Sequence, residues 1–112
     1  MHKERFIDLL ALVDSGADDC LFPMEVAHLL SLDLDPNKSH SYVGIGEGEV
    51  EAIFGEVTLE VGGWPIKLYA GFADAPSVVP ILGQNGFFSV FEVCFKLTMA
   101  RIELKPTRGT RQ

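Results

Sequence analysis

Asp14 is the residue whose position most clearly suggests chemistry. It follows the apolar run Ala11-Leu12-Val13, and the next residues, Ser15-Gly16-Ala17, are small. A carboxylate delivered by a hydrophobic strand is costly to desolvate, and small neighbours leave space and free backbone donors beside it. This pattern favours a site at which Asp14 takes part in acid–base chemistry. An Asp-Ser-Gly sequence is also a common turn for ordinary backbone reasons, so a purely structural turn remains the alternative at this point.

Two apolar segments that end at polar bends are the elements that would position such a site. Residues 5–13 are apolar and partly β-branched, which predicts a central strand that ends at Asp14. Residues 78–82 form a second apolar segment, followed by the bend Gly83-Gln84-Asn85-Gly86. The second segment therefore repeats the design of the first.

The remaining predicted elements are mostly strands. Apolar periodicity after Pro23 predicts one short amphipathic helix over residues 24–31. Glycines at 44, 46 and 48 lie between two β-like stretches, which is typical of a hairpin tip. Because helices account for little of the chain, the pattern predicts a mainly β domain, closer to a small barrel than to a sandwich. Further strands are expected over residues 50–61 and 64–72, joined by a hairpin turn at Gly62-Gly63, and over residues 91–95 and 101–105.

Length and charge limit the class of protein. The 112 residues fit one domain, which we place at residues 1–105 and follow with a disordered tail at residues 106–112. The formal net charge of −7 repels phosphate backbones and anionic lipid, so neither a nucleic acid nor a membrane is expected as a partner. Two cysteines without metal-site spacing and the absence of a long apolar run favour a soluble, cytoplasmic protein. We expect no metal or other cofactor, and we expect Cys20 to be a packed thiol.

Four short segments resemble, in the right order, the retropepsin-like aspartic proteases, the family that includes the retroviral proteases. Residues 12–19, Leu-Val-Asp-Ser-Gly-Ala-Asp-Asp, resemble the active-site strand and loop of that family, and Gly44-Ile45-Gly46 resembles its flap tip. Residues 81–85, Ile-Leu-Gly-Gln-Asn, are similar to its second apolar strand, and Phe87-Phe88 match the start of its short C-terminal helix. The resemblance spans residues 6–106. It implies a mainly β, closed acid-protease barrel with one or two short helices and one active-site lobe per chain.

The resemblance implies an aspartic endopeptidase that acts on polypeptides as a homodimer, because each chain supplies one Asp-Ser-Gly loop. Asp14 and its symmetry mate would share a proton, and the pair would activate a water and polarise the scissile carbonyl. Ser15 would brace the two loops across the dimer, and Gly16 would let the substrate backbone approach closely. The predicted catalytic residues are therefore Asp14, Ser15 and Gly16.

Further positions matched to the family would bind the substrate. Asp18 and Asp19 would contact its backbone or tie down the loop, and the flap would close over it as over an added strand. Apolar subsites are expected from Ile45, Val79 and Ile81. The predicted substrate-binding residues are Ala17, Asp18, Asp19, Gly44, Ile45, Gly46, Val79 and Ile81.

Two departures from the family pattern leave other functions open. Gln84 stands where relatives have an arginine that braces the loop containing the residue matched by Asp18, so a weaker brace is expected. The strand and turn that normally precede the catalytic strand are reduced to residues 1–5, which predicts a truncated first hairpin. Loss of that strand would alter the dimer geometry, leave a sheet edge open, or reflect a shortened chain. A catalytically weak or inactive peptide-binding or dimerisation module is therefore the alternative. A small β-barrel whose Asp-Ser-Gly is a plain turn is the third hypothesis.

Overall fold

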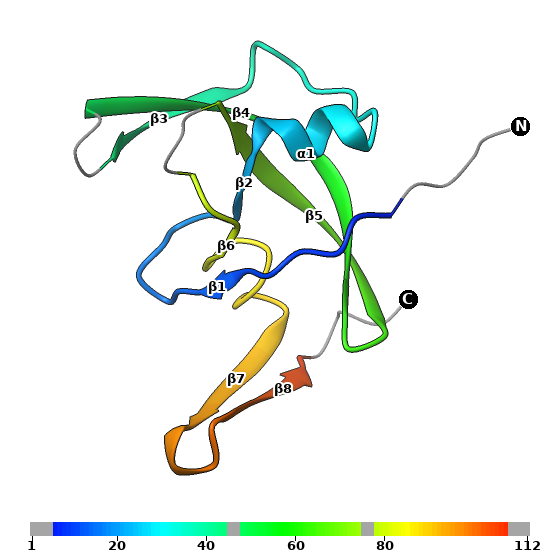
Figure 1. Cartoon of the computed structure of the whole chain (residues 1–112), viewed down its shortest axis with the longest axis vertical. Coiled ribbons are helices and arrows are strands. Elements are labelled where there is room, and N and C mark those ends of the chain that lie inside the picture. Colours follow the sequence, from blue (N-terminus) through cyan, green and yellow to red (C-terminus); the bar gives the residue numbers. More distant parts are fainter. Residues whose placement is uncertain (1–5, 45–47, 75–77, 108–112) are drawn as a thin grey trace, which may run out of the picture.

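The computed structural model describes residues 6–44, 48–74 and 78–107, and within these ranges the protein is mainly β (Figure 1). One sheet has six strands, and a separate antiparallel pair follows it in the sequence. In spatial order the sheet contains β1 (Leu12–Val13), β6 (Ile81–Leu82), β2 (Leu21–Pro23), β5 (Trp64–Ala73), β4 (Gly48–Val61) and β3 (Ser39–Gly44). The other elements are α1 (Met24–Leu29), β7 (Phe91–Lys96), a 3-10 turn (Leu97–Met99) and β8 (Arg101–Pro106).

The β4–β5 hairpin is the longest regular feature of the sheet, and its turn was correctly predicted. The two strands pair from Val61↔Trp64 to Ala52↔Ala73. Gly62 and Gly63 form the turn with φ of 57° and 81°, values that favour glycine because a side chain would be strained there. These local requirements explain why the hairpin could be predicted from the sequence.

The core lies beside the central strand β5, in which burial alternates over residues 66–70 and is continuous over residues 70–73. Ile66 and Leu68 are buried, whereas Lys67 and Tyr69 are exposed, as the two-residue period of a strand requires, and Phe72 lies in the continuously buried part. The Phe72 ring stacks on the ring of Phe22 from β2, with 5.8 Å between their centroids. Two buried residues of α1, Val26 and Ala27, join the same core.

The sheet does not close into a barrel in the part of the chain that the structure describes. β1 and β3 are the two edge strands of this sheet. The prediction of a closed barrel is therefore wrong for the described residues, whereas the prediction of a mainly β domain is confirmed. The prediction that the first strand is central is also wrong, because β1 pairs with β6 alone. The predicted strand over residues 5–13 is reduced to Leu12–Val13, since residues 6–11 are not assigned to any strand. Apolar composition favours an extended chain, but a strand also needs a hydrogen-bonding neighbour.

Of the two predicted helices, the one after Pro23 is present and the one at Phe87 is not. α1 begins at Met24, as predicted, but ends two residues before Ser31, which takes a φ of 56° and stops the helix. The short helix that the resemblance implied at Phe87 is replaced by turns, in which the N–H groups of Val90 and Phe91 both donate to the Phe87 carbonyl. No helix among the described residues is long and apolar enough to cross a membrane.

Two residues beyond the predicted domain end at residue 105 make backbone hydrogen bonds with the rest of the protein. Pro106 is the last residue of β8 and pairs with Phe91. The Thr107 N–H donates to the Val90 carbonyl over 2.9 Å. Residues 106 and 107, which were predicted to belong to the tail, thus hydrogen-bond to the segment at residues 90–91, and residues 108–112 lie outside the described ranges.

Candidate functional site

The Asp14 carboxylate lies where two parallel strands end side by side. β1 and β6 pair in the register Leu12↔Ile81 and Val13↔Leu82, and the Asp14 N–H donates to the Leu82 carbonyl over 3.0 Å (Figure 1). Because parallel strands point the same way, the bends that follow them emerge at the same edge of the sheet. We call residues 14–19 loop A and residues 83–86 loop B. The pairing of β1 with β6 therefore brings loop A and loop B together.

Loop A turns tightly around the Asp14 side chain. The Gly16 N–H donates to the Asp14 Oδ1 over 2.9 Å, and the Ala17 N–H donates to the Asp14 carbonyl over 3.1 Å. This is the pattern by which an aspartate holds its own turn. Asp14 is half-buried, while Ser15 and Gly16 are exposed. The carboxylate is thus oriented by its loop and remains accessible from outside.

Backbone hydrogen bonds tie loop B to loop A. The Gln84 N–H donates to the Ala17 carbonyl over 2.9 Å, and the Asn85 N–H donates to the Asp18 carbonyl over 2.8 Å. Gly83 makes this approach possible, because a Cβ at that position would overlap the carbonyl oxygens of Ala17 and Asp19. The two loops are therefore held together as one unit.

Two side-chain amides of loop B add to this bracing. The Gln84 Nε2 donates to the Ser15 carbonyl over 2.8 Å, and the Asn85 Nδ2 donates to the Asp19 Oδ1 over 3.0 Å. The brace that was expected to be weak at Gln84 is thus a neutral hydrogen bond, and it acts on Ser15. The sequence assigned no role to the Asn85 side chain, and its place in a polar bend after an apolar strand was the one available indication.

Cys20 directly follows loop A in the sequence and hydrogen-bonds to loop B. Its side chain is fully buried, its Sγ accepts from the Gly83 N–H over 3.4 Å, and it donates to the Asn85 carbonyl over 3.5 Å. Burial raises the pKa of the Cys20 thiol, and the Asp19 charge adds to this, while the hydrogen bond from Gly83 opposes it. The arrangement is that of a packed, protonated thiol and not of a nucleophile.

We expect the buried thiol of Cys20 to make the folded protein less stable at alkaline pH. Because burial raises the pKa of the thiol, the folded protein keeps it protonated at pH values at which the unfolded chain ionises, above about pH 8.5. Ionisation then favours the unfolded state, so the free energy of unfolding falls as the pH rises. We expect the free energy of unfolding of the wild type to fall more steeply between pH 8 and 10 than that of Cys20→Ala, measured by urea denaturation. Cys94→Ala is the matched control, since Cys94 is exposed. Equal slopes for Cys20→Ala and the wild type would contradict this assignment.

The other predicted site residues fall at different places. Ile81 lies in β6 between β1 and β2, Asp18 is exposed in loop A, and Val79 is exposed just before β6. Gly44 ends β3 opposite Gly48. Figure 1 shows the β3–β4 hairpin on the same side of the view as loop A but separate from it. Ile45 and Gly46, the centre of the predicted flap, lie outside the described residues.

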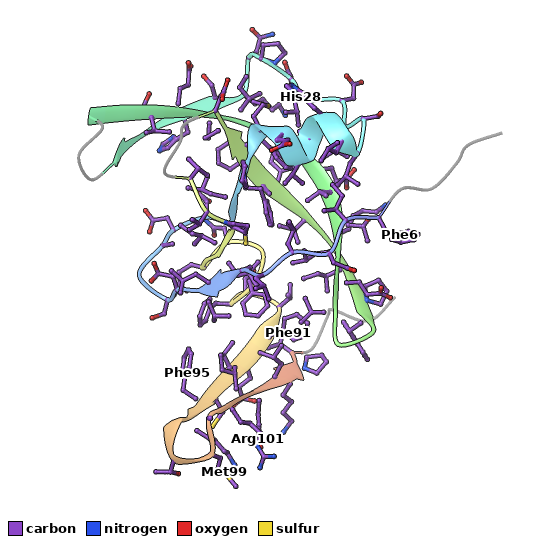
Figure 2. All side chains as sticks on the ribbon, viewed as in Figure 1. Phe6, His28, Phe91, Phe95, Met99 and Arg101 are labelled. Atoms are coloured by element: carbon purple, nitrogen blue, oxygen red, sulfur yellow. The ribbon has the colours of Figure 1, made fainter. Side chains whose placement is uncertain are left out.

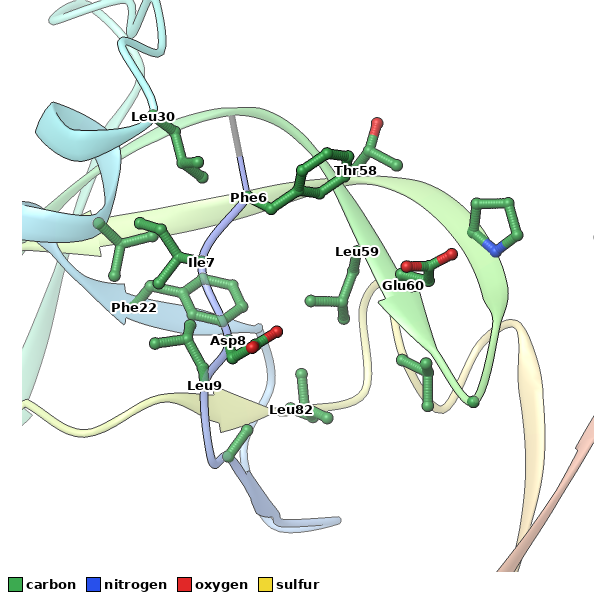
Figure 3. Close-up of a pocket in the computed structure, with 15 residues that line it drawn as sticks. Phe6, Ile7, Asp8, Leu9, Phe22, Leu30, Thr58, Leu59, Glu60 and Leu82 are labelled. Carbon is green, nitrogen blue, oxygen red and sulfur yellow. The ribbon is translucent and has the colours of Figure 1, made fainter. Parts of the chain in front are cut away.

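An apolar cavity of about 700 Å³ lies away from loop A (Figure 3). Apolar side chains such as Phe22, Leu30 and Leu82 form its walls, and the carboxylates of Asp8 and Glu60 also line it. Its lining comes from the segment before β1, from β2, α1 and β6, and from the β4–β5 hairpin, and it includes no residue of loop A. The sequence did not indicate this cavity.

The chemistry that the site can support comes from its carboxylates. Across the described ranges no group of three His, Cys, Asp or Glu side chains is placed to hold a metal ion. The Asp14 carboxylate can accept a proton from water or, when protonated, donate a hydrogen bond to a carbonyl. Compared with models of protein families, with curated proteins and with solved structures, the chain gives no significant match.

Proposed function

We propose that this protein is an aspartic endopeptidase whose active site is completed in a homodimer, with one Asp14 contributed by each copy. The observation that carries the proposal is the presentation of Asp14 at the joined ends of β1 and β6, in a loop braced by loop B. A retropepsin-like fold, as implied by the sequence motifs, is part of the proposal. So is a cytoplasmic setting, which suits the buried free thiol of Cys20.

In this proposal a second copy of the chain supplies the second carboxyl group of the active site. Aspartic proteolysis requires two carboxyl groups close enough to share a proton. Asp19 of loop A accepts a hydrogen bond from Asn85, and Asp18 is exposed with its carbonyl bonded to loop B. We therefore assign the second carboxyl group of the dyad to the Asp14 of another copy. The exposed Ser15 and Gly16 leave loop A open to a partner.

In the proposed reaction the two Asp14 carboxyl groups hold one proton between them. The ionised group removes a proton from a water molecule as the water oxygen attacks the scissile carbonyl carbon. The protonated group gives its proton to the carbonyl oxygen, so that a neutral tetrahedral intermediate forms. As the C–N bond breaks, the carboxyl group that took the proton from water gives it to the leaving amine, and the other carboxylate takes a hydroxyl proton from the intermediate, which leaves a carboxylic acid product. The dyad then returns to its singly protonated state.

A peptide-binding module without turnover is the second candidate function. The position of β1 at one end of the sheet, among the residues that the structure describes, favours it, because an edge strand can accept an extended peptide as an added strand. The neutral Gln84 also favours it, since no cation reinforces loop A at that position. In this case peptides would bind without being cut.

Cleavage of a diverse peptide library distinguishes the two functions. The wild type is incubated with the library at mildly acidic to neutral pH, over a series of protein concentrations, and products are identified by mass spectrometry. We expect cleavage at apolar positions, with a rate that rises with the square of the protein concentration while monomers predominate. Peptides that are retained but not cut would support the binding module. A rate strictly proportional to concentration across the monomeric range would contradict the shared site.

A further inference from the structure

The apolar cavity between the segment before β1, α1 and the β4–β5 hairpin is larger than the spaces that packing alone leaves in a protein (Figure 3). Its volume is about 700 Å³. Close-packed interiors have few voids larger than a water molecule, whereas sites for small molecules have volumes of about 300–1,000 Å³. The size of this cavity is therefore that of a small-molecule site.

Most of the cavity wall is apolar. Phe22 of β2, Val26 of α1 and Leu82 of β6 are buried and contribute to it. Ile7 and Leu59 are half-buried, and Figure 3 shows the Leu59 side chain pointing from β4 toward the segment that holds Ile7. Because burial of hydrocarbon surface is favourable, walls of this kind bind the apolar part of a ligand.

Two carboxylates are the charged groups of the lining. Asp8 lies in the segment before β1 and Glu60 in β4, and both residues are exposed. Figure 3 shows the Asp8 carboxylate directed toward the side of the cavity on which Glu60 lies. None of the described residues that line the cavity is basic. The described lining therefore combines apolar walls with negative charge only.

Charge and burial together indicate the class of ligand and its orientation. A charged group is costly to bury, so it stays at the exposed carboxylates, while the apolar part of the ligand lies against buried side chains such as Phe22 and Leu82. Ammonium groups form charge-assisted hydrogen bonds with carboxylates, whereas the headgroup of a fatty acid would be repelled by them. The lining thus favours a cationic ligand over an anionic one.

We propose that this cavity binds a small amphipathic amine, a molecule with a hydrocarbon body and an ammonium group. The hydrocarbon body fills the apolar part of the cavity, and the ammonium group lies against the carboxylates of Asp8 and Glu60. The inference goes beyond the proposed function and does not depend on it, because the cavity includes no residue of loop A or loop B.

Isothermal titration calorimetry with decylamine and decanoate tests the proposal. The two probes share a hydrocarbon chain, and at neutral pH one carries an ammonium group and the other a carboxylate. Below the concentrations at which the probes form micelles, we expect the wild type to bind decylamine at least about tenfold more tightly than decanoate. A wild type that binds neither probe, or that binds decanoate as tightly as decylamine or more tightly, overturns the proposal.

A double variant tests the assignment of the charge. Asp8→Asn/Glu60→Gln should lose the preference for decylamine, because amides cannot pair with an ammonium group as carboxylates do. Asp33→Asn/Glu56→Gln is the matched control, since it changes the net charge equally at exposed carboxylates that do not line the cavity. A preference that survives in the first variant, or that is lost equally in the control, contradicts the role of Asp8 and Glu60.

A variant that fills the cavity tests the role of its walls. Leu59→Trp places a larger apolar side chain in the space and should weaken the binding of decylamine by about tenfold or more. A strand position accepts an aromatic residue, and circular dichroism checks that the variant is folded. Decylamine binding that is as tight in folded Leu59→Trp as in the wild type would show that the probe does not occupy this cavity.

NMR spectra of the methyl groups locate the bound probe independently of any substitution. Decylamine should shift the methyl signals of Leu30 and Leu59, which line the cavity, and leave that of the exposed Met99 unchanged. Figure 2 shows Phe6, another lining residue, well separated from Met99, so the two places are distinguishable. Shifts at Met99 without shifts at Leu30 and Leu59 would place the probe on an exposed apolar surface and remove the cavity as its site.

Discussion

Asp14→Asn is expected to lower kcat/KM for peptide cleavage by about 10³-fold or more, while the protein keeps its fold. The amide oxygen of asparagine can still accept the hydrogen bond that Gly16 gives to Asp14, so loop A retains its turn. The amide cannot take a proton from water, and two amides cannot share one. Cleavage is measured with a peptide that the wild type cuts, and far-UV circular dichroism checks the fold. Asp33→Asn is the matched control, since Asp33 is an exposed carboxylate outside the site.

The same variant tests whether the site is shared between copies. A mixed dimer of wild-type and Asp14→Asn chains contains one carboxyl group where the mechanism needs two. Adding excess variant to a fixed amount of wild type should therefore reduce cleavage as mixed dimers form. Undiminished cleavage in such mixtures, or cleavage by Asp14→Asn alone near the wild-type rate, would contradict a dyad of two Asp14 residues.

Gly83→Ala is expected to lower the free energy of unfolding by about 3 kcal/mol or more. The added methyl group would overlap the backbone carbonyl oxygens of Ala17 and Asp19, which no side-chain rotation can relieve. Loop B would have to move away from loop A, and the hydrogen bond from Gln84 to Ala17 would be lost. We also expect cleavage to fall at temperatures where the variant is still folded, because loop A loses its brace.

Urea denaturation measures this effect against a second glycine substitution. Gly62→Ala is the matched control, since Gly62 has a φ of 57° but open space around its Cβ position. Its cost should be about 1–2 kcal/mol, from backbone strain alone. A Gly83→Ala variant no less stable than Gly62→Ala would show that the two loops are not closely packed.

Local sequence patterns predicted the elements that depend on near neighbours. The Gly62-Gly63 turn, the start of α1 after Pro23 and the turn at Asp14 each need residues a few positions apart. Backbone conformation and short-range hydrogen bonds determine such features, so residue type and spacing are sufficient to predict them. The mainly β class followed in the same way.

Long-range pairing decided the rest. The resemblance placed loop A and loop B in one family pattern, but the hydrogen bond from Gln84 to Ser15 joins residues 69 positions apart. It exists because β1 and β6 are parallel neighbours, which no local pattern specifies. The same dependence explains why the strand before Asp14 was predicted too long and too central, since the apolar residues 6–11 indicated an extended chain but not a partner for it.

The sequence by itself determined that a carboxylate follows an apolar strand in a turn of small residues, and that a second apolar strand ends in a polar bend. The tertiary structure decided that the two bends meet, that the Cys20 thiol hydrogen-bonds to loop B, and that β7 and β8 form a sheet separate from the other six strands of the described residues. The physical reason is the range of the interactions. Turn geometry depends on neighbouring residues, whereas strand order depends on the best burial and pairing of the whole chain.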